Sequence, residues 1–197
     1  MIKPYSESCD QNREPILAVI SLLFAPASNV LEIGSGTGQH AVFFAEQMPH
    51  LTWHTSDCKA YLDGIDLWLA EAALPNLVPP IELDVSASKW PVMAIDAIFT
   101  ANSVHIMHQS DVVNLFIGAG NLLADNGSLV IYGPFNYNKR YTSESNARFD
   151  QWLKARDPES GVKHFEEIES LAIANGMKLV KDYEMPANNR ILHFIKV

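Results

Sequence analysis

Glycines at every second position follow an acidic residue in the first quarter of the chain. Residues Val30 to His40 read VLEIGSGTGQH, so that Glu32 lies in a short apolar strand pattern and glycines stand at positions 34, 36 and 38. Glycine has no Cβ, so such a turn can adopt positive φ and bring bare backbone against a ligand at the start of a helix. The spacing predicts a strand, a tight turn and a helix that bind a nucleotide-like cofactor.

The same spacing narrows the class of cofactor. A dinucleotide fingerprint needs a glycine three residues after its second one, but that position is Gln39. A phosphate-binding P-loop needs Gly-Lys followed by Ser or Thr, and the run does not contain it. The pattern therefore disfavours a dehydrogenase and a nucleoside triphosphatase.

Acidic residues also follow the next two predicted strands. Asp57 follows a strand predicted over 51–56, and Asp84 follows one predicted over 81–83. Ligands of open α/β sheets bind beyond the carboxyl ends of the strands, so both carboxylates are expected beside the glycine turn. Asp57 can accept bonds from both hydroxyls of a ribose, and Asp84 from an adenine amino group. The alternative for each aspartate is an ordinary turn or helix cap.

Together these residues resemble motif I and the acidic positions that follow it in the class I methyltransferases dependent on S-adenosylmethionine (SAM). The resemblance implies that the glycine turn passes under the methionine part of SAM and that the leading acid helps to hold its ammonium group. S-adenosylhomocysteine (SAH) is then the product. The cofactor residues expected on this basis are Glu32, Gly34, Ser35, Gly36, Gly38, Asp57, Asp84 and Asn102.

The stretch after the fourth predicted strand, residues 100–108, holds the candidate catalytic residue. Enzymes of this superfamily that methylate amino groups of nucleic acids usually carry Asn or Asp followed by Pro-Pro and an aromatic residue, which this stretch does not contain. His105 has an ordinary pKa near neutrality and can act as a general base. The alternative is that His105 packs beside the adenosyl group and moves no proton. His105 and His108 have no evident third ligand, so no metal site is expected.

Several further runs resemble one family of unknown function, family 938 of the domains of unknown function, which includes methyltransferase-like protein 26. The family's substrate is not established, so this resemblance implies the cofactor class without the reaction. The matching runs cover nearly the whole chain: NREPIL (12–17), SGTGQH (35–40), YGPF (132–135), YTSESN (141–146), RDP (156–158) and EMPANN (184–189).

Runs that follow the last strands are expected to meet over the transferred methyl group. A polar pocket there, with Arg140 and Arg156 nearby, suits a small polar or anionic substrate. Ser145 and Asn146 are equally well explained as helix-cap residues. The expected substrate-side residues are Tyr132, Arg140, Ser145, Asn146, Asn188 and Asn189.

Composition limits the possible partners. A net charge of −9 argues against a nucleic-acid surface. Residues 134–163 nevertheless hold six basic and four acidic side chains, whereas residues 1–133 hold four basic and fourteen acidic ones. This segment either draws an anionic group toward an acidic protein or is an ordinary solvated helix and loop.

Length and the cysteine pattern indicate the kind of protein. The 197 residues, 48% of them hydrophobic, suit one domain over 1–197. Cys9 and Cys58 form no CxxC pair, which favours a reducing compartment. The N-terminus has no apolar signal region and the longest apolar run is too short to span a bilayer, so a cytoplasmic protein is expected. The oligomeric state is not determined by the sequence.

The elements that position these residues alternate along the chain. Periodicity predicts helices over 14–24, from 40, over 61–73, 110–123 and 165–175, and strands over 96–101 and 128–132 besides those above. This alternation predicts an α/β fold with a parallel sheet and helices on both faces. An insertion at about 134–163 carries a short helix, and the chain ends in two antiparallel strands, 177–183 and 191–197. The resemblance implies a Rossmann-like, seven-stranded, mostly parallel sheet with one antiparallel strand.

Three functions remain open. The leading one is SAM-dependent methyl transfer to a small molecule. The alternative is a non-catalytic module that binds SAM or SAH, because no general base is unmistakable. A third, adenosyl chemistry such as aminopropyl transfer, needs paired acids for a polyamine, and the net-positive insertion argues mildly against it.

Overall fold

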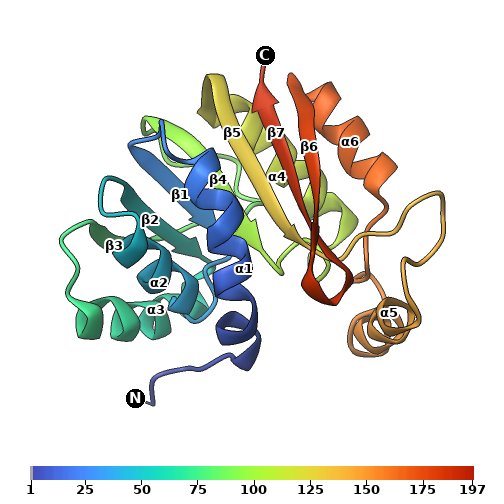
Figure 1. The fold of residues 1–197 in the computed structure, drawn as a ribbon, viewed down its shortest axis with the longest axis horizontal. Helices are drawn as coiled ribbons and strands as arrows, with labels where there is room; N and C mark the ends of the chain where they lie inside the picture. The colour runs from blue at the N-terminus through green and yellow to red at the C-terminus, as the bar shows by residue number, and fades with distance from the viewer. Residues whose placement is uncertain (1) are drawn as a thin grey trace.

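Seven strands form one sheet in the computed structural model, which describes residues 2–197 (Figure 1). The strands are β1 (Asn29–Ile33), β2 (Thr52–Asp57), β3 (Leu77–Glu82), β4 (Ile95–Ala101), β5 (Leu123–Gly133), β6 (Met177–Met185) and β7 (Asn189–Lys196). Their order is β3-β2-β1-β4-β5-β7-β6; β7 runs antiparallel to β5 and β6, and all other neighbouring pairs are parallel. The predicted, mostly parallel sheet with one antiparallel strand is therefore confirmed.

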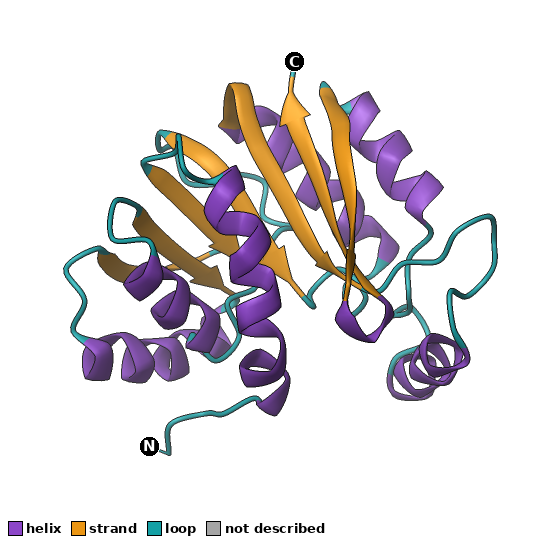
Figure 2. Ribbon diagram, in the orientation of Figure 1, coloured by secondary structure: helices purple, strands orange, loops and turns teal. Residues whose placement is uncertain are grey.

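Helices cover both faces of this sheet (Figure 2). The helices are α1 (Glu7–Leu23), α2 (Gln39–Gln47), α3 (Lys59–Ala72), α4 (Gln109–Leu122), α5 (Glu144–Arg156) and α6 (Phe165–Ala174), with a short 3-10 helix, η1 (Pro186–Asn188). Helices α1 and α2 pack on one face, and α4 and α6 on the other. None of these helices within residues 2–197 combines the length and the apolar character that crossing a membrane requires.

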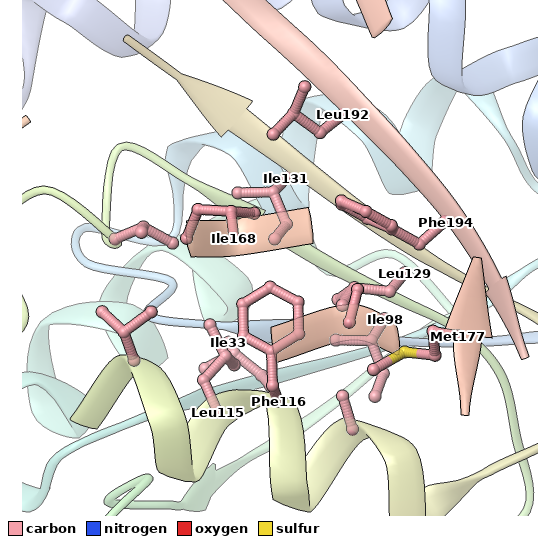
Figure 3. Close-up of a cluster of buried hydrophobic side chains, with 14 of the residues drawn as sticks. Ile33, Ile98, Leu115, Phe116, Leu129, Ile131, Ile168, Met177, Leu192 and Phe194 are labelled. Atoms are coloured by element: carbon pink, nitrogen blue, oxygen red, sulfur yellow. The ribbon is translucent and has the colours of Figure 1, made fainter. Parts of the chain in front are cut away.

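Adjacent strand residues contribute to opposite faces of the core. Val30 belongs to the cluster under α1 and α2, whereas Leu31 belongs to the cluster under α4 and α6, because successive side chains of a strand alternate. In the second cluster the Phe116 and Phe194 rings meet edge to face with centroids 6.2 Å apart (Figure 3). Burial on both faces explains why the central strands are mostly apolar.

Helix α1 begins seven residues before its predicted start at Glu14. Pro15 therefore lies inside the helix, where it contributes no N–H to the ladder. The additional turns are held by tertiary contacts: the Ser6 N–H donates to Gln39 Oε1, and His40 Nε2 lies 2.7 Å from Asn12 Oδ1. The prediction was wrong because these contacts leave no apolar periodicity in the sequence.

The insertion adds a helix beyond one end of the sheet. Figure 1 shows α5 at the same end of the sheet as the start of α1 and the turn between β6 and β7.

Strand β3 is longer than predicted and contains Pro79 and Pro80, which an edge strand tolerates because one side of it needs no N–H donors.

Candidate functional site

A cavity of about 770 Å³ lies at the carboxyl ends of β1, β2 and β4. Its walls come from the glycine turn, the ends of β2 and β3, the loop after β4, helix α3 and the N-terminal segment. Six of the eight predicted cofactor residues line it: Gly34, Ser35, Gly36, Asp57, Asp84 and Asn102. Residues distant in the sequence thus share one wall, as expected at the strand ends of an open sheet.

The glycine turn presents its backbone to this cavity. Gly34, Gly36 and Gly38 have φ of 71°, 58° and 88°, a region that L-residues with side chains rarely adopt. Apart from residue 36 and its two chain neighbours, no atom of residues 2–197 lies within 4 Å of where a Cβ on Gly36 would be. The turn is therefore open on its ligand side and ready to receive a group that lies against the backbone.

Asp57 fixes the turn from the end of β2. Its Oδ2 accepts the Gly36 N–H at 2.7 Å, and its Oδ1 accepts the Cys58 N–H at 2.7 Å. Burial raises the pKa of this carboxyl, and the two backbone bonds oppose that shift. Each carboxylate oxygen has two lone pairs, so Asp57 keeps acceptor capacity for two further hydroxyls.

Asp84 and Asn102 belong to neighbouring loops of the cavity. Asp84 Oδ1 accepts from the Ser86 N–H at 2.8 Å and from the Ser86 hydroxyl at 2.7 Å, which lowers the pKa of Asp84. Asp84 therefore does form a turn, and both of these bonds use the same oxygen. Asn102 holds φ of 58° and donates its N–H to Tyr132 O at 2.9 Å. Such a left-handed residue marks a loop constrained by its surroundings.

The other two predicted cofactor residues lie behind the wall. Glu32 is 1% exposed, and its Oε2 accepts the Trp53 indole N–H at 3.0 Å. Burial raises the pKa of Glu32 to about 7, against the opposing bonds from Trp53 and Ser35. A Cβ on Gly38 would lie 3.3 Å from Ile65 Cα in α3. Gly38 thus allows α3 to pack closely against the turn.

His105 is buried away from the cavity lining. It is 7% exposed, and its ring meets the Phe149 ring edge-on with centroids 5.0 Å apart. Burial, and then the charge of Lys163, lower the pKa of His105 to about 4. The carbonyl of His105 accepts the Gly161 N–H at 2.8 Å. The insertion therefore covers His105, whose role as a general base stays a prediction.

We expect His105 to make stability sensitive to acid. Its folded pKa lies below the unfolded value of about 6.5, so its contribution is complete above that pH and is lost as the pH falls toward 4. A His105→Phe variant keeps a ring against Phe149 and cannot titrate. Denaturant unfolding measures the free energy of unfolding at pH 7.5 and at pH 4.5. Between these pH values the free energy of unfolding should fall by about 1–3 kcal/mol less in the variant than in the wild type. Equal losses in both proteins would refute the buried neutral state.

The substrate-side residues form two local contacts outside the cavity lining. Asn146 Nδ2 donates to the Asn188 carbonyl at 3.1 Å, which joins α5 to η1. Burial raises the pKa of the Tyr132 hydroxyl, and the nearby side chains of Asn189 and Asn12 oppose that rise. These contacts connect β5 and the insertion to the loop between β6 and β7.

Two other predicted substrate residues are on the surface. Arg140 is exposed at the end of a tight hairpin that pairs it with Tyr137. Ser145 is exposed and its hydroxyl lies 2.8 Å from that of Ser143, whose Oγ accepts the Asn146 N–H. The run therefore does cap helix α5, and the capping residue is Ser143 rather than Ser145 or Asn146.

Sequence reasoning missed the contribution of the N-terminal segment to the cavity. Ile2, Pro4, Ser6, Ser8 and Cys9 all line it. This segment has no apolar periodicity, so its sequence carries no signal that would place it against the cavity. Among residues 2–197 no three His, Cys, Asp or Glu side chains gather as a metal site would require.

Comparison with known families identifies the relatives of the chain. The family model described as "Protein of unknown function (DUF938)" matches residues 3–196. The chain belongs to the DUF938 family. The resemblance inferred from the six sequence runs is therefore confirmed, and the fold and cavity above are those of a DUF938 protein.

Solved methyltransferases share the fold of this DUF938 chain. The mitomycin 7-O-methyltransferase MmcR superposes with a TM-score of 0.84 at 14% identity, over 96% of this chain and 54% of that one. Human N-acetylserotonin methyltransferase, solved with SAM, superposes with a TM-score of 0.82 at 12% identity, over 96% of this chain and 53% of that one. An O-methyltransferase family 2 protein from Planctomyces limnophilus, solved with apigenin, superposes with a TM-score of 0.76 at 17% identity, over 86% of this chain and 51% of that one. The chain spans about half the length of these structures and has the class I methyltransferase fold.

Proposed function

We propose that this chain binds SAM in the cavity and transfers its methyl group to a small polar or anionic molecule, acting as one domain. The observation that carries the proposal is the open face of the Gly36 turn beside the free acceptor capacity of Asp57. A cavity of about 770 Å³ also falls within the range that holds cofactor-sized ligands.

The residues of the lining fit the ribose, the adenine and the backbone-facing part of this cofactor. Asp57 would accept the ribose hydroxyls, Asp84 the adenine amino group, and the backbone from Gly34 to Gly36 would lie against the methionine part. Glu32 does not line the cavity, and its contact with the ammonium group stays a prediction. SAM supplies a methyl group already activated by a sulfonium. The protein has to align the acceptor and exclude water, so no fixed catalytic triad is required.

The relatives in structure support a small-molecule acceptor. One of them was solved with apigenin, and another is described as a mitomycin 7-O-methyltransferase. The insertion of this chain adds a net-positive segment beside the loop that follows β4, which favours polar or anionic acceptors. A thermal-shift screen of metabolites with SAH present tests this preference, and stabilisation by only apolar or cationic compounds would reject it.

We expect Asp57→Ala to weaken SAH binding by about tenfold or more. A charged hydrogen bond is worth about 1.5–3 kcal/mol, and the variant also releases the Gly36 N–H. Titration calorimetry measures the loss. Asp66→Ala, which removes an exposed carboxylate from α3, is the matched control and should bind as the wild type does. Unchanged affinity in Asp57→Ala would remove this residue from the site.

Transfer of a labelled methyl group separates the enzyme from the non-catalytic alternative. Purified protein is incubated with SAM labelled in the methyl group and a cell extract, and the products are resolved by chromatography. A labelled product that disappears when Gly36 is changed to Asp supports the enzyme. Binding of SAH without any labelled product supports the non-catalytic module.

A further inference from the structure

We propose that residues 2–9 form a strap that closes one wall of the cofactor cavity, and that Gln39 is the positioning residue that holds it there. The inference rests on the proposed SAM site and adds a segment and a residue to it. Five strap residues line the cavity, from Ile2 to Cys9. Ahead of Glu7 the strap is neither helix nor strand, so side-chain contacts must hold it.

The Gln39 side chain satisfies both backbone groups of Ser6. Gln39 Oε1 accepts the Ser6 N–H, and Gln39 Nε2 donates to the Ser6 carbonyl at 3.3 Å. The Thr37 hydroxyl, inside the glycine turn, donates to the same Oε1 at 3.0 Å. One buried amide, 5% exposed, therefore joins the strap to the turn that faces the cavity. A glycine at this position, as in a dinucleotide fingerprint, has no side chain to do this.

A second anchor comes from α3. The Trp68 indole N–H donates to the Pro4 carbonyl at 2.7 Å, and Lys3 Nζ lies 3.7 Å from the centre of a Trp68 ring. Gly64 leaves the space for Pro4, because a Cβ there would lie 2.8 Å from Pro4 Cγ. The strap is thus fastened to α2 at Ser6 and to α3 at Pro4.

The part of the strap ahead of Glu7 is irregular and is held by the anchors at Pro4 and Ser6, so we expect it to detach from the cavity as one unit. Segments with few backbone bonds open locally at low free-energy cost, and each lost anchor lowers that cost further. Opening would further expose Cys9, the half-buried last residue of the strap, and would remove the Ser6 and Ser8 part of the wall. The strap should therefore slow the release of the cofactor.

Gln39→Leu tests the proposal because it keeps the volume and removes the polar contacts. We expect SAH to dissociate about tenfold faster than from the wild type, measured by stopped-flow displacement, since the three hydrogen bonds described above are lost. Without SAH, the alkylation rate of Cys9, followed by peptide mass spectrometry, should rise several-fold. The exposed Cys58 in the same molecule is the internal reference and should react at an unchanged rate.

Two further variants make the result specific to the strap. Gln47→Leu, at the exposed end of α2, should leave both rates as in the wild type. Trp68→Phe should accelerate SAH release as well, and its combination with Gln39→Leu should do less than the product of the two effects, because both release one segment.

The strap and the SAM site fail in different ways. If the wild type binds SAH but Gln39→Leu releases it at the wild-type rate, the strap proposal is rejected. It is also rejected if Gln39→Leu accelerates release while Cys9 keeps its wild-type reactivity, because Gln39 then acts on the turn itself. If the wild type binds no SAH, the proposed function fails, and unchanged Cys9 reactivity in Gln39→Leu would still reject the strap.

Discussion

A Gly36→Asp variant should lose at least about a hundredfold in SAH affinity while remaining folded. The backbone at Gly36 has φ of 58°, which costs a residue with a side chain about 1–2 kcal/mol. The new side chain would extend into the open cavity, and its carboxylate would face Asp57, whose Oδ2 lies 2.7 Å from the nitrogen of residue 36. Loss of space, charge repulsion and backbone strain therefore act together.

Calorimetry with SAH measures this loss, and thermal unfolding shows whether the fold persists. Because no described protein atom beyond the two chain neighbours lies within 4 Å of the new Cβ, core packing should be unaffected. Gly36→Ala is the matched control, since it carries the backbone strain without the charge, and it should keep more affinity than the aspartate variant. An affinity of Gly36→Asp within about threefold of the wild type would place the cofactor elsewhere.

A Glu32→Gln variant should be more stable than the wild type above pH 7. The folded pKa of Glu32, about 7, lies above its ordinary value of 4.5, so the folded protein holds this proton to higher pH than the unfolded chain. The contribution of Glu32 to stability is therefore greatest below pH 4.5 and falls as the pH rises to 7. The shift corresponds to a gain on the order of 2–3 kcal/mol for the variant at pH 8, and almost none at pH 4.5.

Denaturant unfolding at both pH values measures this difference. The glutamine can still accept the Trp53 indole N–H, so the change isolates ionisation from packing. A variant that is equally destabilised at pH 4.5 and pH 8 would mean that Glu32 is ionised in the folded protein.

Binding should reveal whether Glu32 also serves the cofactor. If it holds the ammonium group of SAH, binding at pH 6 must ionise it and release close to one proton. Calorimetry in two buffers with different ionisation enthalpies counts that proton, and Glu32→Gln should release none and bind about tenfold more weakly at pH 8. Identical proton counts in both proteins would leave Glu32 with a structural role only.

Local sequence patterns were sufficient for the part of the site that follows strand ends. The glycine turn, Asp57 and Asp84 were predictable because a parallel sheet brings successive carboxyl ends to one edge. The alternation of strands and helices likewise specified the two-faced sheet.

Local sequence patterns could not predict contacts between segments that lie far apart in the sequence. Nothing near Glu32 indicates that Trp53 bonds to it, and nothing near His105 indicates that Phe149 covers it. The early start of α1 depends on Gln39 and His40 from another helix. Such contacts arise from how the elements pack, so periodicity, which describes one element at a time, carries no trace of them.

The position of the N-terminal segment also decides how the protein should be produced. Ile2 lines the cavity, so an affinity tag fused on the N-terminal side of this segment would emerge beside the cavity and disturb the proposed strap. The C-terminus emerges at the opposite end of the sheet, where Val197 is exposed (Figure 1). Purification handles and surface-immobilisation tags belong at that end, and binding constants measured with an N-terminal tag should be repeated after its removal.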